Sequence, residues 1–405
     1  MHITKTIVRA LGSAILMGAS LSLFSYTGAD VLTDISQREK PVTLKILIEH
    51  QAARVILETK GRYYLYNPAT GTHITTSAMG KRQFIYPEEE GLHWGDLYPL
   101  FQLRVVPGDS QSTIFVNGRQ YRGCVEIYNV NGTLYIINEV DVENYLKSTL
   151  TYQFTDTFPQ EVMDAIAIVA RTQAYYYLAK NPDAFWHADA KKVGYDGLGV
   201  TLQNIHVDRA VENTRHTVLT YKEGVFAATW TNNCGGKTAN FNAIFRKNAL
   251  TPNGVTAPFA AHDRTKNNWS FSLTKQRLSE LLNIDRLRTI ELYLEPKSNK
   301  VYAVRLSTET KEFDMDFFSF QKMVGENNLL SNDFSVIHQG DKVLFSGFGE
   351  GHGVGLCLYS AKLMAEHGSK TPAILSAFFP ETKLERVQHF SELHIGGEPK
   401  TTSTD

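Results

Sequence analysis

The stretch DTFPQEVMDAIAIVARTQAYYYLAKNP, residues 156–182, carries the clearest helical pattern in this chain. Asp156 or Thr157 can cap the helix, and Pro159 suits its first turn because that position needs no N–H donor. Apolar side chains then recur at intervals of three and four, which predicts one buried helix face. The stripe comprises Val162, Ala165, Ile166, Val169 and Tyr176. Arg171 falls outside this stripe, on another side of the predicted helix.

The residues on both sides of this helix are rich in strand patterns. Between residues 42 and 137, short alternating runs such as TLKILIE and RVILE are separated by turn-forming residues. Asn117-Gly118 and Asn131-Gly132 each stand between apolar runs, as two-residue hairpin turns do. Further strand-like runs follow residue 215, and two more helices are expected at residues 276–282 and 356–367. We therefore predict a β-rich α+β fold with a few helices.

The composition excludes several classes of function. The chain has 405 residues, 42% of them apolar, and a formal net charge of −1, so it can bury a sizeable core. Nucleic acid is not an expected partner, because no basic excess is present. The cysteines at positions 124, 234 and 357 are scattered, without the spacing of a zinc site, and we expect neither a metal nor a cofactor.

The N-terminus has the pattern of an export signal. Lys5 and Arg9 precede an uncharged stretch over residues 10–26, and small residues follow up to Ala29. This order predicts a signal peptide over residues 1–29. An uncleaved membrane anchor is the alternative, although the stretch is shorter and less apolar than the roughly 20 residues that a membrane span prefers. In both cases we expect an exported protein of the periplasm or cell envelope.

Two polar loops are candidates for a functional site. FGEGHGVGLCLYSAKLMAEHG, residues 348–368, alternates glycines around His352, but lacks both phosphate-binding spacing and a second histidine at metal-ligand spacing. The glycines make room for a bulky neighbour, either a substrate or another backbone, and a tight structural turn is the alternative. TWTNNCGGKT, residues 229–238, has the composition of an exposed loop at a strand end, where sites often lie.

In this order, the segments resemble those of the SpoIID/LytB family, which comprises stage II sporulation protein D and the amidase-enhancer proteins. The resemblance runs from residue 121 to residue 384 and covers five motifs. Besides the two loops, they are YRGCVEIYNVNGTLYIINEVDVENYLKS, FPQEVMDAIAIVARTQAY and ILSAFFPETKL. The resemblance implies a single SpoIID-like core over residues 121–390, with a few helices around a glycan-binding groove. Around it we expect a polar link (30–41), an N-terminal β-rich region (42–120) and a disordered tail (391–405).

The resemblance also implies an envelope protein that acts on peptidoglycan, in a division or sporulation context. Some family members are lytic transglycosylases, which cleave denuded glycan strands and leave a 1,6-anhydro end. In that reaction one carboxylic acid protonates the leaving oxygen, and its conjugate base then assists the attacking muramoyl 6-hydroxyl. Other members modify a cell-wall amidase. The implied partners are therefore glycan strands stripped of stem peptides and an amidase.

This chain departs from the family at its catalytic position. Gln153 stands where catalytic members have the glutamate, and an amide has no proton to give. Glu350 replaces a family tryptophan two residues before His352. Either the chain binds glycan or modifies an enzyme without the acid, or Glu350 has taken over proton transfer.

The resemblance implies a groove in which the glycines make room for sugar rings. Arg171 would bind an acetamido carbonyl or a lactyl carboxylate, and His352 a sugar hydroxyl, whereas Glu143 and Glu161 would have structural roles. The expected groove residues are Gln153, Arg171, Thr231, Cys234, Gly235, Gly236, Gly351, His352 and Gly353.

Overall fold

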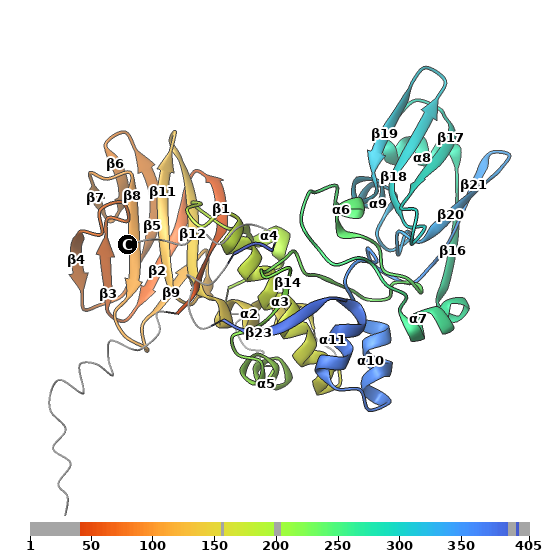
Figure 1. The fold of residues 1–405 in the computed structure, drawn as a ribbon. Helices are drawn as coiled ribbons and strands as arrows, with labels where there is room; N and C mark the ends of the chain where they lie inside the picture. The colour runs from red at the N-terminus through yellow and green to blue at the C-terminus, as the bar shows by residue number, and fades with distance from the viewer. Residues whose placement is uncertain (1–40, 155–157, 198–203, 388–393, 397–405) are drawn as a thin grey trace, which may run out of the picture. The chain divides into compact units, whose positions relative to one another are not determined.

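The computed structural model describes residues 41–154, 158–197, 204–387 and 394–396 (Figure 1). The expected signal peptide, the link up to residue 40, the capping residues Asp156 and Thr157 and most of the expected tail lie outside these ranges. Residues 41 onward form one compact unit. Helices and strands are both abundant in it, and the predicted α+β class is confirmed.

Two antiparallel sheets dominate the N-terminal part of the described chain. The seven-stranded sheet has the order β13 (Ala188–Asp189), β1 (Thr43–Ala52), β12 (Thr133–Asp141), β11 (Cys124–Val130), β8 (Gln102–Pro107), β3 (Tyr63–Tyr66) and β4 (His73–Ser77), with β13 parallel to β1. The six-stranded set has the order β10 (Arg119–Tyr121), β9 (Thr113–Val116), β2 (Val55–Lys60), β5 (Lys81–Glu88), β6 (Gly91–Trp94) and β7 (Asp96–Tyr98). Because β11 and β12 pair with β8 and β1, the seven-stranded sheet continues across the boundary expected at residue 120.

Both predicted hairpins are present. Asn117 and Gly118 connect β9 to β10, and Asn131 and Gly132 connect β11 to β12. All four residues have positive φ, between 49° and 81°. Two successive residues with positive φ give the type I′ turn whose twist matches that of the paired strands, which is why Asn-Gly occurs here.

A group of helices packs beside the sheets. α2 (Val142–Gln153) follows β12 directly, and the Asp141 side chain caps it by accepting from the Asn144 N–H at 3.1 Å. α3 (Gln160–Lys180) begins after Pro159, and its predicted apolar stripe is buried. Around α3 lie α5 (Ile205–Asn213), α10 (Leu358–Glu366), α11 (Thr371–Phe378) and the pair β14 (Thr217–Tyr221) with β23 (Thr382–Arg386). One hydrophobic cluster runs from the sheets into these helices.

A second hydrophobic cluster has its own strands and helices. β16 (Asn268–Thr274), β21 (Lys342–Phe348) and β20 (Phe334–Gln339) form one three-stranded sheet. β17 (Leu287–Leu294), β18 (Val301–Thr308) and β19 (Glu312–Asp316) form another. Apolar side chains from these strands pack with those of α8 (Lys275–Leu282) and α9 (Phe317–Val324). α8 matches the helix predicted at residues 276–282, and α10 matches that predicted at 356–367.

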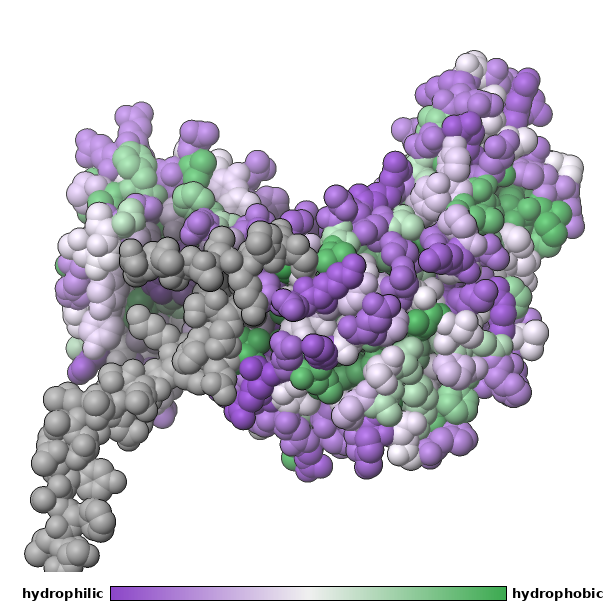
Figure 2. All heavy atoms as spheres, in the orientation of Figure 1, coloured by the Kyte–Doolittle hydropathy of each residue, from purple (hydrophilic) through white to green (hydrophobic). Residues whose placement is uncertain are grey.

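The remaining elements are short. They are α4 (Ala190–Val193), β15 (Trp230–Thr231), α6 (Phe241–Phe245), α7 (Pro258–His262), the 3-10 turn η1 (Arg264–Asn267) and β22 (Leu356–Cys357). Hydrophilic residues cover much of the visible face, with hydrophobic ones interspersed (Figure 2). Within the described ranges, no helix combines the length and apolar character that crossing a membrane requires.

Candidate functional site

A cavity of about 280 Å³ lies where α2 and α3 approach the two polar loops. Its size is near the lower end of the roughly 300–1,000 Å³ of ligand pockets. Gln153 and His352, which come from motifs far apart in sequence, both line it. The other lining residues are Tyr145, Leu146, Thr149, Ala170, Gln173, Tyr177, Lys192, Val193, Ala228, Thr229, Trp230, Phe241, Phe245 and Lys247.

Helical spacing explains how α2 and α3 supply one wall. Tyr145, Thr149 and Gln153 are four residues apart and therefore lie on one face of α2. Gln173 and Tyr177 have the same spacing on α3. Sequence analysis does not predict α2 as a helix and therefore misses this wall. The four-residue spacing of Tyr145, Thr149 and Gln153 is the sequence pattern that could have indicated it.

Gln153 is the last residue of α2 and reaches across to α4. Its Nε2 donates to the Val193 carbonyl oxygen at 3.3 Å, and its side chain is exposed toward the cavity. Tyr152, the residue before it, is 67% exposed and does not line the cavity. The residue that the resemblance aligns with the family's acid therefore lies at the cavity wall and carries an amide.

His352 is held in a neutral state. Its Nδ1 accepts from the Val354 N–H at 3.2 Å, and its ring packs edge-on against Phe245 with 5.1 Å between ring centroids. Burial lowers the pKa of His352 to about 4, although backbone hydrogen bonds oppose this shift. At neutral pH the imidazole is uncharged and is not an acid that can protonate a leaving oxygen.

The glycines of the His352 loop make room for another backbone. β15 and β22 pair in parallel, and Asn233 and Glu350 exchange backbone hydrogen bonds of 2.9 and 2.8 Å. A Cβ on Gly355 would stand 2.0 Å from the Thr229 carbonyl oxygen, and one on Gly349 would stand 2.3 Å from that of Asn233. The expectation that these glycines accommodate sugar rings is therefore wrong, because the 229–236 loop occupies that space.

Most of the loop residues that we expected in the groove lie beneath its surface. Thr231 is buried, and its Oγ1 accepts from the Gly353 N–H at 3.1 Å while donating to the Glu350 carbonyl at 3.2 Å. Cys234 is also buried; its hydrogen bond with Cys357 and its burial raise the pKa of its thiol, which therefore stays protonated. None of Thr231, Cys234, Gly235, Gly236, Gly351 and Gly353 lines the cavity.

Arg171 does not reach the cavity either. Its side chain is fully buried, and its Nε and Nη2 donate to the two carboxylate oxygens of Glu143 at 2.9 and 2.7 Å. The same guanidinium also donates to the Thr214 hydroxyl and to the carbonyls of Val211 and Thr217. Because every direction around it is occupied, Arg171 offers nothing to a sugar, and its expected place in the groove is corrected to a structural one.

Glu143 and Glu161 have the structural roles expected of them. Glu143 is the partner of Arg171, and Glu161 lies in the first turn of α3. The Glu161 carboxylate accepts from the Thr371 N–H at 2.8 Å and from the Lys370 Nζ at 2.9 Å, so it ties α3 to the start of α11.

Glu350 is exposed on the outer side of its loop. Its Oε1 accepts from the Asn232 Nδ2 at 2.9 Å, and the residue does not line the cavity. Among the described residues that do line the cavity, none is an aspartate or a glutamate. The geometry thus gives no support to Glu350 as a replacement acid.

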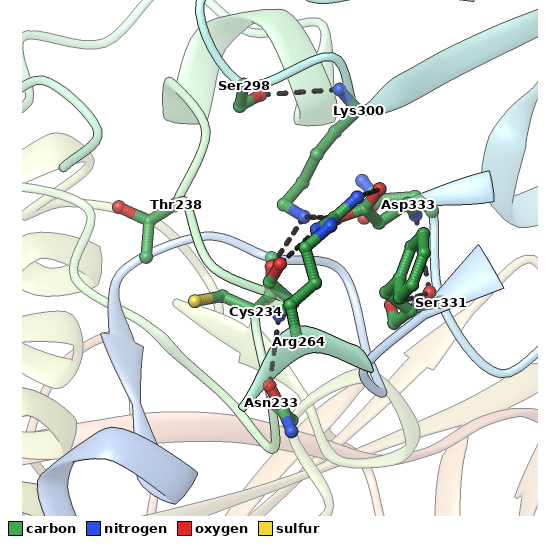
Figure 3. A network of polar contacts seen from close by, with 12 residues as sticks. Asn233, Cys234, Thr238, Arg264, Ser298, Lys300, Ser331 and Asp333 are labelled. Carbon is green, nitrogen blue, oxygen red and sulfur yellow. Dashed lines mark hydrogen bonds and ion pairs between the residues drawn. The ribbon is translucent and has the colours of Figure 1, made fainter. Parts of the chain in front are cut away.

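A largely buried ion network contacts both loops (Figure 3). Lys300, 1% exposed, donates from Nζ to the Cys234 carbonyl at 2.7 Å and to Asp333 Oδ2 at 3.1 Å. Arg264 donates two hydrogen bonds, of 2.6 and 2.9 Å, to the carboxylate of Asp333 and also donates to the Gly235 carbonyl. A Cβ on Gly353 would lie 2.3 Å from Lys300 Cε, so this glycine also accommodates the lysine. No sequence pattern had indicated this network.

The described residues contain no group of three His, Cys, Asp or Glu side chains close enough to hold a metal ion. The chemistry that remains at the cavity is that of aromatic rings, phenols, threonine hydroxyls, amides, one neutral imidazole and two lysines. Burial raises the pKa values of Tyr145 and Tyr177, so both phenols stay protonated and can donate hydrogen bonds.

Comparisons with known proteins identify sequence relatives of this chain. A family model described as stage II sporulation protein (SpoIID) matches residues 130–221, which contain α2, α3, α5 and β14. An uncharacterized protein of Chlamydia pneumoniae is 33% identical over 185 residues, covering 45% of this chain and 67% of that protein. One of Chlamydia muridarum is 30% identical over 227 residues, 55% of this chain and 79% of that protein. The amidase enhancer of Bacillus subtilis is 24% identical over 343 residues, covering 70% of this chain and 46% of the enhancer.

Proposed function

This chain belongs to the SpoIID/LytB family and has a cell-wall-related function, and on that premise we propose that it binds peptidoglycan glycan strands without cleaving them. The single observation that carries the proposal is the cavity itself. It lies at the family's acid position, yet Gln153 stands there and the described lining contains no carboxylate.

The lining has the chemistry that binds sugars. A sugar ring offers an apolar C–H face, which packs on aromatic rings such as those of Trp230 and Tyr177, and hydroxyl and acetamido groups at its rim. Gln173 lines the cavity and is half-buried, so its side-chain amide can exchange hydrogen bonds with a hydroxyl or acetamido group of a bound glycan.

The lining lacks the acid that strand cleavage needs. Loss of a positioned general acid typically lowers a rate by about 10²–10⁴-fold. Neither the Gln153 amide nor the neutral His352 ring can supply this proton at neutral pH. Glycan binding is therefore the proposed activity, and lytic transglycosylase chemistry is not part of it.

A second candidate function is modification of a cell-wall amidase. The similarity to the Bacillus subtilis amidase enhancer over 70% of this chain favours it. Both functions place the protein at the cell wall, and we propose that it is exported to the periplasm or cell envelope. An amidase modifier without affinity for glycan would stimulate the enzyme on soluble substrates. A glycan binder, in contrast, would be retained on the wall even when the enzyme is absent.

Co-sedimentation with denuded sacculi tests the proposed function. The wild-type protein should sediment with the sacculi, and the variants Trp230→Leu and Gln173→Leu should bind about tenfold more weakly, because each removes one contact of the proposed kind. Tyr152→Ala is the matched control, since Tyr152 is exposed beside the cavity and does not line it. If the wild-type protein does not sediment, or if the control loses as much affinity as the cavity variants, the proposal fails.

A further inference from the structure

Two of the three cysteines of this chain meet where the two polar loops pack together. Cys234 lies in the 229–238 loop, and Cys357, 123 residues later, is the last residue of β22. The Cys234 N–H donates to the Cys357 Sγ at 3.2 Å, and the Cys234 thiol is hydrogen-bonded to the same sulfur. Both side chains are buried. Figure 3 shows the Cys234 thiol pointing away from the ion network, which contacts only the backbone carbonyl of this residue.

The surroundings of the two sulfur atoms give them different reactivity. Burial opposes ionisation of Cys357, but hydrogen bonds from the thiol and the N–H of Cys234 and from Ser360 lower its pKa to about 7. The Cys234 thiol, whose pKa is raised, stays protonated. Because the thiolate is the nucleophile in thiol–disulfide exchange, Cys357 is the better attacking group. Cys234 is placed beside it, as a resolving cysteine is.

We propose that Cys234 and Cys357 are a disulfide-forming pair that joins the two loops by a covalent bond. The Cys357 thiolate attacks one sulfur of an external small-molecule disulfide, such as oxidised glutathione, and releases one glutathione thiolate. Cys234 then gives up its proton and attacks the Cys357 sulfur, which releases the second. Two protein thiols are oxidised, one external disulfide is reduced, and the two glutathione thiolates take up the two protons. Because the pair is buried, this exchange occurs as the chain folds or when the loops separate.

The bond closes a segment that contains the whole second hydrophobic cluster. The buried residues of this cluster run from Leu278 to Phe345, between the two cysteines. A cross-link restricts the unfolded chain, and its stabilising effect increases with the length of the closed segment. The bond also ties β22 to the loop that follows β15, which carries the cavity residue Trp230. The inference goes beyond glycan binding, and it needs the proposed export only to bring the protein to an oxidising compartment.

Counting thiols after equilibration with reduced and oxidised glutathione tests the inference. The buffer contains urea below the unfolding transition, so that the loops open and the buried thiols can exchange. The wild type should fall from three free thiols per chain to one. A tryptic digest should contain the peptides 223–237 and 343–362 joined by a bond that dithiothreitol cleaves. The oxidised protein should have a Tm about 5–10 °C above that of the reduced protein.

The control variant is Cys124→Ser, because Cys124 lies on β11, where its Sγ donates to Glu139 at 3.8 Å. It should fall from two free thiols to none and keep the rise in Tm, whereas Cys234→Ala should show neither the joined peptides nor the rise. Three remaining thiols in the wild type, or a bond that includes the Cys124 peptide 123–147, would overturn the inference and leave glycan binding intact. Failure of the protein to sediment with sacculi would instead remove the proposed function without affecting the disulfide.

Discussion

Arg171 and Glu143 form a fully buried, two-bond ion pair, with Nε to Oε1 at 2.9 Å and Nη2 to Oε2 at 2.7 Å. The pair joins the middle of α3 to the first turn of α2, the two helices that supply one wall of the cavity. A buried ion pair adds little net stability, but removing one partner leaves an uncompensated charge in the core. The pair therefore holds α2 and α3 together and has no direct role in binding.

We predict that Arg171→Ala lowers the free energy of unfolding by about 3–5 kcal/mol, because Glu143 then remains buried without its partner. Urea denaturation followed by circular dichroism measures this loss. Arg209→Ala on α5 is the control, since Arg209 is exposed and its removal should change stability by no more than about 0.5 kcal/mol. An Arg171→Ala protein of unchanged stability that had lost glycan binding would show that the arginine acts in the site after all.

Gly355→Ala should destabilise the protein more than Gly368→Ala. Both glycines have positive φ, 78° and 89°, so both substitutions carry the same backbone strain of about 1–3 kcal/mol. A Cβ at Gly355 meets the Thr229 carbonyl at 2.0 Å, whereas nothing lies within 4 Å of one at Gly368. The difference between the two free energies of unfolding isolates the contact between the loops. Equal losses would mean that the loops are not packed as described.

The stability of the protein should depend on the ionisation of His352. Its pKa is about 4 in the folded state and near 6.5 when unfolded, so the unfolded state binds an extra proton between these values. The contribution of the neutral ring is complete above pH 6.5 and is lost progressively as the pH falls toward 4. Thermal unfolding across this range should show a steeper decline for the wild type than for His352→Gln. Parallel declines would contradict an imidazole that is neutral in the folded state.

Gln153→Glu should restore the missing acid. At this position a glutamate keeps a hydrogen bond to the Val193 carbonyl only while it is protonated, which raises its pKa toward the range in which a general acid works. We expect 1,6-anhydro ends from denuded strands at about 10²–10⁴ times the wild-type level. Mass spectrometry of the digest measures them, and Gln160→Glu at the start of α3 is the control. A folded variant that binds strands but produces no such ends would show that a bound strand does not present its glycosidic bond to this position.

Local sequence patterns were sufficient for much of the fold. The Asn-Gly hairpins and α3 follow from turn chemistry and from three- and four-residue apolar spacing, which act within a few residues. The site was harder to predict because its geometry depends on contacts over 100 residues apart, such as that between Asn233 and Glu350. Arg171 illustrates the limit: the resemblance placed it in the groove, whereas an ion pair with Glu143 from another helix allows it to be buried.

The dependence on long-range contacts also explains which residues of the candidate site could be named from the sequence. Gln153 and His352, both named from their motifs, line one cavity. Lys192 and Lys247 lie in segments without any motif, and only the folded chain brings them to the same cavity. Sequence similarity drew attention to Gln153 and His352, whereas the two lysines at the cavity became apparent only from the tertiary structure.

We propose that this protein binds denuded glycan strands and does not cleave them. The most direct measurement incubates the wild-type protein with denuded strands and determines, in one sample, the bound fraction and the number of 1,6-anhydro ends. We expect a retained strand with no new ends, and the same result for Glu350→Gln. New 1,6-anhydro ends from the wild type that disappear in Glu350→Gln would contradict it, because the exposed carboxylate would then be the acid that the cavity lacks.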